Sequence, residues 1–180
     1  MFKYVGDISK IAHNIIKTYY ENNNVALDGT LGNGFDCDFL SELFKTVYAF
    51  DIQRTAVENY ARKNKENVIL INDSHENITT YIKEEIDVAM FNLGFLPGGD
   101  KNITTKSEST IKSINSTLEL LKSGGIITIA VYVGHDEGKK ESVELLAFIS
   151  QLSKDIFGVM THKFANRNDN APFLIVIEKK

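Results

Sequence analysis

The chain has 180 residues, of which 43% are hydrophobic and 24% are charged, and these are the proportions of a globular protein that buries a sizeable core. Its formal net charge of −4 argues against a protein that coats duplex nucleic acid, although an enzyme could still bind a nucleic acid with one local basic patch. The single cysteine, Cys37, excludes a disulfide framework and a paired-cysteine zinc site, so we expect a reducing compartment and no metal. We find neither a signal peptide nor an apolar run of ~20 residues, and we therefore expect a cytoplasmic protein with no membrane partner.

Apolar runs that are typical of strands alternate with helical patterns along the chain. The apolar spacing between Ile8 and Tyr19 predicts an N-terminal helix. Strands are then expected at 25–28, 47–51, 68–73, 87–93 and 126–133, and helices at 35–44, 56–63, 107–122 and 141–153. Gly124 and Gly125 are expected to end the helix that precedes them. The last two strands, 158–164 and 173–178, are joined by a link too short for a crossover helix and predict an antiparallel hairpin.

This order predicts one α/β domain over residues 1–180, in which the helix within 1–22 packs on the core. The expected fold is a doubly wound, Rossmann-like sandwich whose seven-stranded sheet is mostly parallel and ends in the C-terminal antiparallel hairpin. Ligands bind such sheets at the carboxyl ends of the strands. The site should therefore form from the loops that follow Asp28, Asp51, Asp73, Asn92 and Val133.

The segment from Asp28 to Gly34, which we call the glycine loop, reads Asp-Gly-Thr-Leu-Gly-Asn-Gly and lies between a strand and a helix. Its glycines are spaced G-x-x-G-x-G, whereas the dinucleotide fingerprint is G-x-G-x-x-G, so the pattern disfavours a nicotinamide oxidoreductase. Missing side chains allow the backbone to approach a ligand closely, and Asp28 could accept a hydrogen bond from a cationic amino group. A plain glycine-rich turn is the alternative for the glycines taken alone.

Acidic residues at the ends of the next two strands extend this pattern. Asp51 is placed to accept both hydroxyls of a ribose, and Asp73 stands where an adenine edge would lie. Each could be an ordinary helix cap, but together with the glycine loop they predict S-adenosylmethionine as the cofactor. The candidate cofactor-binding residues are Asp28, Gly29, Thr30, Gly32, Asn33, Gly34, Asp51, Ile52, Gln53, Asp73, Ser74, His75 and Asn92.

The run from Asn92 to Asp100 resembles the Asn-Pro-Pro-Tyr loop of amino-group methyltransferases. The amide oxygen of Asn92 and a nearby backbone carbonyl can take the hydrogens of a nitrogen nucleophile and aim its lone pair. Phe95 could stack on an extruded base. A glycine-rich connecting loop with a buried phenylalanine is the alternative. The candidate catalytic residues are Asn92, Leu93, Phe95, Tyr132 and His135.

A desolvated pocket favours the neutral form of an amine, so a dedicated general base is not required. If the site has one, His135 is the best candidate among the four histidines. His13 and His162 are expected to be structural.

Four segments together resemble a bacterial family of ribosomal-RNA methylases, which are class I enzymes dependent on S-adenosylmethionine. The segments are Asp28-Gly-Thr-Leu-Gly-Asn-Gly34, Ala49-Phe-Asp-Ile-Gln53, Phe91-Asn-Leu-Gly-Phe-Leu-Pro-Gly-Gly-Asp100 and Tyr132-Val-Gly-His135. The first is shared by many methyltransferases, whereas the third is much more specific. The similarity covers essentially the whole chain, although Ala171-Pro172 stands where the family pattern has two prolines.

The resemblance implies a class I methyltransferase that acts on 5-aminomethyl-2-thiouridine at the wobble position of tRNA, with the anticodon stem-loop as its partner. Methylation of rRNA or of a small-molecule amine is a second reading, and a catalytically silent cofactor-binding partner subunit is a third. Basic residues near the expected site could form a phosphate-binding rim: Lys101, Lys106, Lys139, Lys140, Lys163 and Arg167. The first helix or the final hairpin could support a homodimer.

Overall fold

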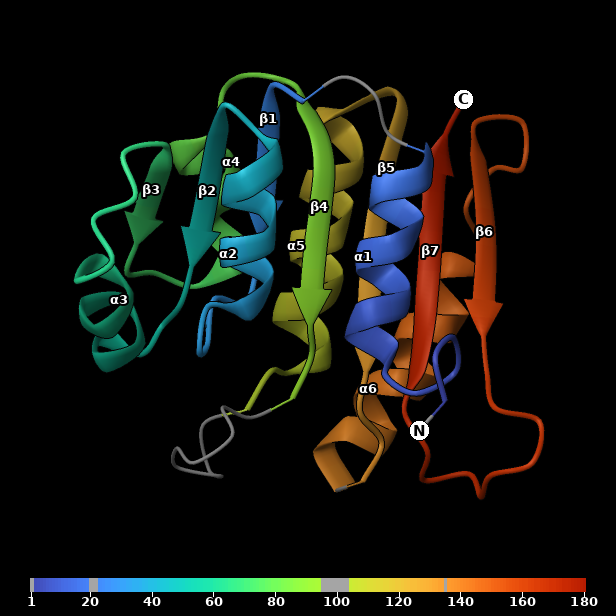
Figure 1. The fold of residues 1–180 in the computed structure, drawn as a ribbon. Coiled ribbons are helices and arrows are strands. Elements are labelled where there is room, and N and C mark those ends of the chain that lie inside the picture. The colour runs from blue at the N-terminus through green and yellow to red at the C-terminus, as the bar shows by residue number, and fades with distance from the viewer. Residues whose placement is uncertain (1, 20–22, 95–103, 135) are drawn as a thin grey trace.

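The computed structural model describes residues 2–19, 23–94, 104–134 and 136–180, and Figure 1 shows its ribbon. The elements follow in chain order: α1 (Ile8–Tyr19), β1 (Val25–Asp28), α2 (Phe35–Leu43), β2 (Thr46–Phe50), α3 (Arg54–Ala61), β3 (Val68–Ile71), the 3-10 helix η1 (His75–Asn77), α4 (Ile78–Tyr81), β4 (Ile86–Asn92), α5 (Ser107–Leu120), β5 (Leu121–Val131), α6 (Asp136–Ile149), β6 (Phe157–His162) and β7 (Phe173–Lys179). None of the helices within these residues has the length and apolar content that a membrane span needs.

Seven strands of the described chain form one sheet in the order β3-β2-β1-β4-β5-β7-β6. The strands from β1 to β5 pair in parallel, whereas β7 is antiparallel to both of its neighbours, β5 and β6. The chain builds outward from β1 to β3 and then returns to place β4 on the other side of β1, so the strand order reverses there. The predicted Rossmann-like α/β sandwich with a C-terminal antiparallel hairpin is confirmed.

The strands carry apolar side chains on both surfaces because helices cover both faces of the sheet. Residues of α1, α2 and α3 share one buried core with the sheet, and residues of α4, α5 and α6 share the other. Figure 1 shows α1 and α2 in front of the sheet and α5 behind it. Successive residues of a strand point to opposite faces. Ala26 of β1 thus joins the first core and its neighbour Leu27 joins the second.

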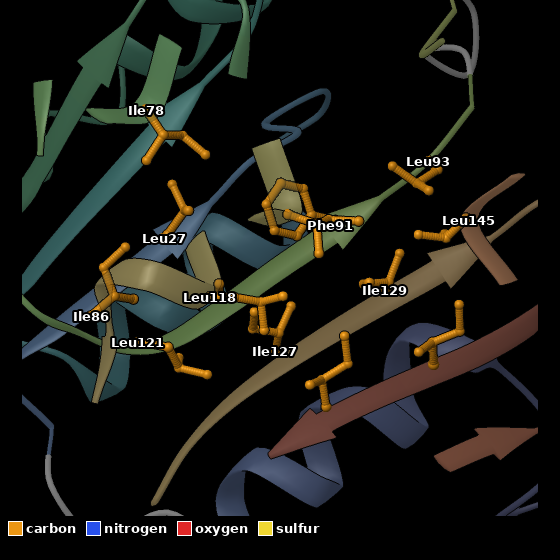
Figure 2. Close-up of a cluster of buried hydrophobic side chains, with 14 of the residues drawn as sticks. Leu27, Ile78, Ile86, Phe91, Leu93, Leu118, Leu121, Ile127, Ile129 and Leu145 are labelled. Carbon is orange, nitrogen blue, oxygen red and sulfur yellow. The ribbon is translucent and has the colours of Figure 1, made fainter. Parts of the chain in front are cut away.

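Figure 2 shows the core between the sheet and the helices α4, α5 and α6. Phe91 of β4 and Ile127 and Ile129 of β5 lie with Leu118 of α5 and Leu145 of α6 in this cluster, and each is at most 4% exposed. Burial of such side chains contributes about 1.5–3 kcal/mol each. This packing holds the end of β4 in place directly before Asn92.

The junction between α5 and β5 differs from the expectation that two glycines end the helix. Gly124 and Gly125 do not end the helix, because α5 stops at Leu120 and β5 begins at the next residue. That residue, Leu121, is 2% exposed and already pairs with β4. The pairing register shifts after it, and Gly124, with φ of 76°, lies in the irregular part of the strand. The free energy gained by burying Leu121 in the sheet therefore outweighs that of extending α5 as far as the glycines.

Three further helical segments differ from the sequence expectation. η1 and α4 fill the link between β3 and β4, where no helix is predicted, and η1 is capped by Ser74, whose side chain accepts a hydrogen bond from the N–H of Glu76. α6 begins at Asp136 rather than at Glu141. Asp136 and Glu137 occupy its first turn, where the helix dipole favours negative charge.

A buried carboxylate links three strands at the edge of the sheet where β1 begins. Asp87 of β4 is fully buried and accepts hydrogen bonds from the N–H groups of Asn24 (2.9 Å) and Val25 (2.7 Å). The Nζ atom of Lys122 lies 2.9 Å from its other oxygen. Asp87 therefore links the starts of β1, β4 and β5 with its charge paired.

Replacing Asp87 with alanine is expected to lower the free energy of unfolding by about 3 kcal/mol, because two backbone donors and the Lys122 ammonium lose their acceptor. Urea denaturation followed by circular dichroism measures this change. The matched control is Asp155→Ala, which removes an exposed carboxylate and should change stability by less than about 0.5 kcal/mol. Equal unfolding midpoints for the two variants would contradict the role given to Asp87.

Candidate cofactor and substrate site

A cavity of about 450 Å³ opens where the parallel strands end, at the edge toward which β2, β3 and β4 point in Figure 1. Its volume lies in the range of small-molecule sites, roughly 300–1,000 Å³. The wall comes from the turns after β1 to β5, from the N-terminal segment and from the starts of α2 and α5. The lining residues are Asp7, Ser9, Gly29, Thr30, Leu31, Gly32, Asn33, Gly34, Phe35, Asp36, Phe50, Asp51, Ile52, Gln53, Asp73, Ser74, His75, Asn92, Leu93, Gly94, Thr104, Thr105, Ser109 and Tyr132.

The glycine loop is held to the strands on both sides of β1. The N–H of Gly29 donates to a β4 carbonyl (2.9 Å), and the N–H of Leu31 donates to the last carbonyl of β2 (2.8 Å). The hydroxyl of Thr30 accepts a hydrogen bond from the N–H of Asn92 (2.6 Å). The loop therefore has a fixed position relative to the ends of β2 and β4.

Two glycines of this loop are required by the packing of the protein itself. A Cβ atom at Gly29 would overlap the ring of Phe91, and a Cβ atom at Gly34 would overlap the ring of Tyr60. Gly34 also has φ of 78°, a backbone conformation that favours glycine. Contacts with the two hydrophobic cores therefore explain these glycines in addition to the close approach of a ligand.

Asp51 lines the cavity with its carboxylate already oriented by the chain. Oδ2 accepts a hydrogen bond from the N–H of Gly32 (2.8 Å), and Oδ1 accepts one from the N–H of Gln53 (2.8 Å). Burial raises the pKa of Asp51, and these two N–H groups oppose the rise. A carboxylate offers about four acceptor positions, so others remain for the hydroxyls of a ribose. Ile52, which is 56% exposed, adds apolar surface to the same wall.

Asp28 corrects another expectation, because it is fully buried behind the glycine loop and does not line the cavity. Its Oδ1 atom accepts a hydrogen bond from the N–H of Thr30 (3.0 Å). Burial raises the pKa of Asp28 well above its ordinary value, and the negative charge of Asp36 raises it further. Asp28 thus retains a proton more readily than an exposed aspartate. Its position supports the loop and does not present a carboxylate to a cationic amino group.

The turn after β3 brings Asp73, Ser74 and His75 to the cavity. The carboxylate of Asp73 accepts hydrogen bonds from the Tyr81 hydroxyl (2.9 Å), the Ser74 N–H (2.7 Å) and the Asn77 amide (3.1 Å). Partial burial acts to raise the pKa of Asp73, but these hydrogen bonds lower it overall. Burial lowers the pKa of His75. This wall therefore combines an ionised, well-bonded carboxylate with a neutral imidazole at pH 7.

The amide of Asn92, at the end of β4, is oriented by residues from α1 and α2. Its Nδ2 atom donates to Oδ2 of Asp36 (3.3 Å) and to Oγ of Ser9 (3.4 Å). The other oxygen of Asp36 lies 2.6 Å from Nε2 of His13. Within the described residues, Oδ1 of Asn92 accepts no hydrogen bond and stays available to a ligand.

The remaining predicted catalytic residues divide into two groups. Leu93 is 1% exposed and Tyr132 is 38% exposed, and both line the cavity. Burial raises the pKa of Tyr132, and its hydrogen bond with Ser9 opposes the rise. Phe95 and His135 lie outside the described residues.

Asp7, Ser9 and Asp36 are polar lining residues that the sequence analysis does not identify. The N–H of Ser9 donates to Oδ1 of Asp7 (2.9 Å), an arrangement typical of a helix start. Asp36 stands in the first turn of α2, where acidic residues are equally ordinary. The one signal in the sequence is the closeness of Asp36 to the glycine loop.

The end of the cavity around Asn92 is acidic. Asp7 and Asp36 line it, and their charges both act to raise the pKa of Tyr132. The described lining includes no lysine and no arginine. Opposite charges attract and like charges repel in such a partly buried place, so this end suits a cationic group such as an amine and disfavours an anionic one.

Comparison with known proteins identifies a family and close structural relatives. A family model with the description "Putative rRNA methylase" matches residues 47–178. The chain is also similar to the "tRNA (mnm(5)s(2)U34)-methyltransferase, chloroplastic" of Arabidopsis thaliana. The identity is 32% over 190 aligned positions, which cover 96% of this chain and 69% of that protein.

Two solved structures resemble this chain over its full length. One is a Clostridium thermocellum protein described as an rRNA methylase, with a TM-score of 0.93, 36% identity and coverage of 100% of both chains. The other is a Streptococcus mutans protein described as "a putative methyltransferase" and solved in complex with SAH, with a TM-score of 0.88, 38% identity and coverage of 100% of both chains. The likeness thus includes both the fold and the sequence.

Asp51→Ala is expected to weaken S-adenosylmethionine binding about tenfold to a hundredfold, because hydrogen bonds from the ribose hydroxyls to a charged acceptor are lost. Isothermal titration calorimetry on the purified chain measures the dissociation constant. Glu58→Ala removes an exposed carboxylate of α3 outside the cavity wall and should leave the constant unchanged. Binding of wild-type strength by Asp51→Ala would refute the ribose assignment.

Proposed function

This chain belongs to the rRNA methylase family and is an S-adenosylmethionine-dependent methyltransferase, and we propose that its acceptor is the amine of 5-aminomethyl-2-thiouridine at the tRNA wobble position. The relative from Arabidopsis is named as a methyltransferase of tRNA position U34. The observation that carries the proposal is the acidic end of the cavity around Asn92, because an alkylamine is cationic in water.

The residues present fit the cofactor. Asp51 would accept the ribose hydroxyls, the turn from Asp73 to His75 would border the adenine, and the glycine loop would face the rest of the molecule. The cofactor supplies a methyl group on a sulfonium centre, so that the leaving group departs neutral. The chain itself has to bind the two partners, align them and exclude water.

Asn92 is proposed to align the acceptor. Its Oδ1 would accept an N–H of the amine and direct the nitrogen lone pair, while its Nδ2 stays bonded to Asp36 and Ser9. Well-oriented reactions gain roughly 7–11 kcal/mol from alignment. The carboxylates attract the amine in its cationic form, which has no free lone pair. The amine would lose one proton to water before it attacks, and the buried surface of Leu93 favours the resulting neutral form.

An unpaired base of an anticodon loop can be splayed into a cavity of this kind and stacked on aromatic side chains. Phe35 is 75% exposed and Tyr132 is 38% exposed, and both line the cavity. These two rings are the proposed stacking surface for the target base and its neighbour.

Phosphate contacts are proposed for a rim of exposed basic residues, which consists of Lys106, Lys139, Lys140, Lys163 and Arg167. Lys163 lies over the ring of Phe173 at 4.6 Å, and Arg167 lies over the ring of Phe164 at 3.6 Å. Aromatic packing therefore holds these two cations on the link between β6 and β7. Lys101, the sixth predicted rim residue, lies outside the described residues.

Asn92→Ala is expected to lower methyl transfer to tRNA at least about a hundredfold while S-adenosylmethionine binding is kept, because only the alignment of the amine is lost. The assay combines the full chain, labelled cofactor and tRNA that carries the unmethylated aminomethyl group. Asn115→Ala is the matched control, since Asn115 is exposed on α5 and, in the part of the chain that the structure describes, its side chain bonds to Glu119. Substantial turnover by Asn92→Ala would remove Asn92 from the chemistry.

The same assay separates the three functions that the sequence leaves open. Label at the wobble uridine supports the proposal. Label on ribosomal RNA or on an added small amine, with none on tRNA, would replace it with the second function. Tight cofactor binding without transfer to any acceptor would indicate a silent partner subunit.

The double variant Lys139→Gln/Lys140→Gln is expected to weaken tRNA binding and to flatten its salt dependence. Each lost phosphate contact should lower the slope of log affinity against log salt by roughly 0.7. Fluorescence anisotropy over a salt series measures both quantities. The control Lys83→Gln/Lys154→Gln removes the same charge from links that precede β4 and β6, at the edge away from the cavity. Identical slopes for the two double variants would exclude Lys139 and Lys140 from the rim.

A further inference from the structure

The side-chain amide of Asn92 has two orientations of almost identical shape, related by a half-turn that exchanges oxygen and nitrogen. Only the orientation with Oδ1 toward the acceptor can take a hydrogen from the amine. The reverse orientation would present N–H groups to an N–H donor. The orientation of the amide therefore decides whether Asn92 can align a nucleophile, and hydrogen bonds from neighbouring groups have to fix that orientation.

The carboxylate of Asp36 determines which way the Asn92 amide is oriented. An ionised carboxylate only accepts hydrogen bonds, so it pairs with Nδ2 of Asn92 and repels Oδ1. Oδ2 of Asp36 lies 3.3 Å from that nitrogen. Asp36 is 7% exposed, which limits competition from water, and the first turn of α2 stabilises its negative charge. That charge is also one reason why the pKa of the neighbouring Asp28 is raised.

His13 holds Asp36 from the other side. Its Nε2 atom lies 2.6 Å from Oδ1, the carboxylate oxygen that does not face Asn92. The imidazole is stacked on Phe39 of α2, with ring centroids 3.9 Å apart and planes 5° from parallel. The ring is thus fixed by a hydrogen bond at its edge and by packing on its face. Ser9, from the first turn of α1, provides a second acceptor for Nδ2 at 3.4 Å.

We propose that Asp36 and His13 are positioning residues that lock the amide of Asn92 with its oxygen toward the acceptor amine. This inference rests on the proposed function, in which Asn92 aligns an amine. It gives a role in the reaction to His13, for which the sequence pattern indicates only a structural one.

Asp36→Asn tests the lock directly, because asparagine has the same shape but can pair with either end of the Asn92 amide. The expected result is a fall in kcat of about a hundredfold, with KM for tRNA and the dissociation constant of S-adenosylmethionine within about threefold of wild type. Asp38→Asn is the matched control on the same helix. Its side chain bonds to Tyr60 and Lys63 outside the cavity wall, so its kcat should equal that of wild type.

A pair of variants at His13 separates the hydrogen bond from packing. His13→Phe keeps a ring on Phe39 and loses the donor, and its kcat should fall about tenfold because Asp36 becomes mobile. His13→Gln loses the ring and keeps an N–H donor, and it should recover most of the wild-type kcat. The reverse order, with His13→Phe active and His13→Gln impaired, would show that His13 only packs.

Side-chain amide spectra provide a readout that does not depend on activity. In ¹⁵N-edited NMR, the NH₂ resonances of Asn92 are identified by their absence in Asn92→Ala. They should shift and exchange faster with water in Asp36→Asn and in His13→Phe, but not in Asp38→Asn. Unchanged resonances would overturn the proposal even if Asp36→Asn folds poorly, because His13→Phe is measured independently.

The outcomes also separate this inference from the proposed function. If Asn92→Ala retains full methyl transfer, the proposed function fails at Asn92 and the lock has no purpose. If Asn92→Ala is inactive while Asp36→Asn and His13→Phe keep the wild-type kcat, the proposed function stands and the lock is wrong.

Discussion

The parallel register of β1 with its two neighbours is the constraint on which the site depends. Asp28, at the end of β1, is in register with Ala49 of β2 and Met90 of β4. The three strands therefore end close together, and their turns leave the sheet at one edge. The glycine loop then bonds to both neighbouring strands through its backbone. This arrangement brings Asp51 and Asn92, which belong to different strands, to one cavity.

Hydrophobic packing sets the shape of the same edge. The rings of Phe91 and Tyr60 lie against Gly29 and Gly34, one from each core, so the loop closely follows the buried surface beneath it. The backbone of the loop that lines the cavity is therefore packed directly on the two cores. Stability and binding are coupled at these positions, because a side chain added at either glycine would have to displace an aromatic ring.

The charges in the site are separated by burial. Asp28 is enclosed behind the loop, where burial raises its pKa, while Asp51 is held by two N–H groups in front of it. Asp36, in the first turn of α2, has His13 of α1 as its partner. Asp51 and Asp36 both line the cavity, the first proposed to accept hydrogen bonds from a ribose and the second to provide negative charge for an amine. The difference follows from where each carboxylate stands, because Asp28 is enclosed at the end of β1 whereas Asp51 follows β2 and lines the cavity.

The sequence by itself determined the order of elements, the class of fold and most of the residues that line the cavity. Apolar periodicity is a local pattern, and the strands of a parallel sheet end at one edge, so Asp51, Asp73 and Asn92 could be placed at that edge from the sequence alone. Local sequence patterns predicted less where the helical tendency of a segment competes with the burial of its side chains in the sheet. Burial of Leu121 ended α5 before the glycines, and a short helix filled the link after β3.

Only the tertiary structure decided the surroundings of Asn92. Its partners Ser9 and Asp36 are 83 and 56 residues away, and His13 contacts Asp36 rather than Asn92 among the described residues. Each of these residues is typical of a helix start or of an apolar helix face, so no local pattern marks it. Periodicity predicts which face of α1 is buried, but not which residues of α2 and β4 that face meets. That choice follows from the packing of the helices across the sheet, and it created the acidic end of the cavity.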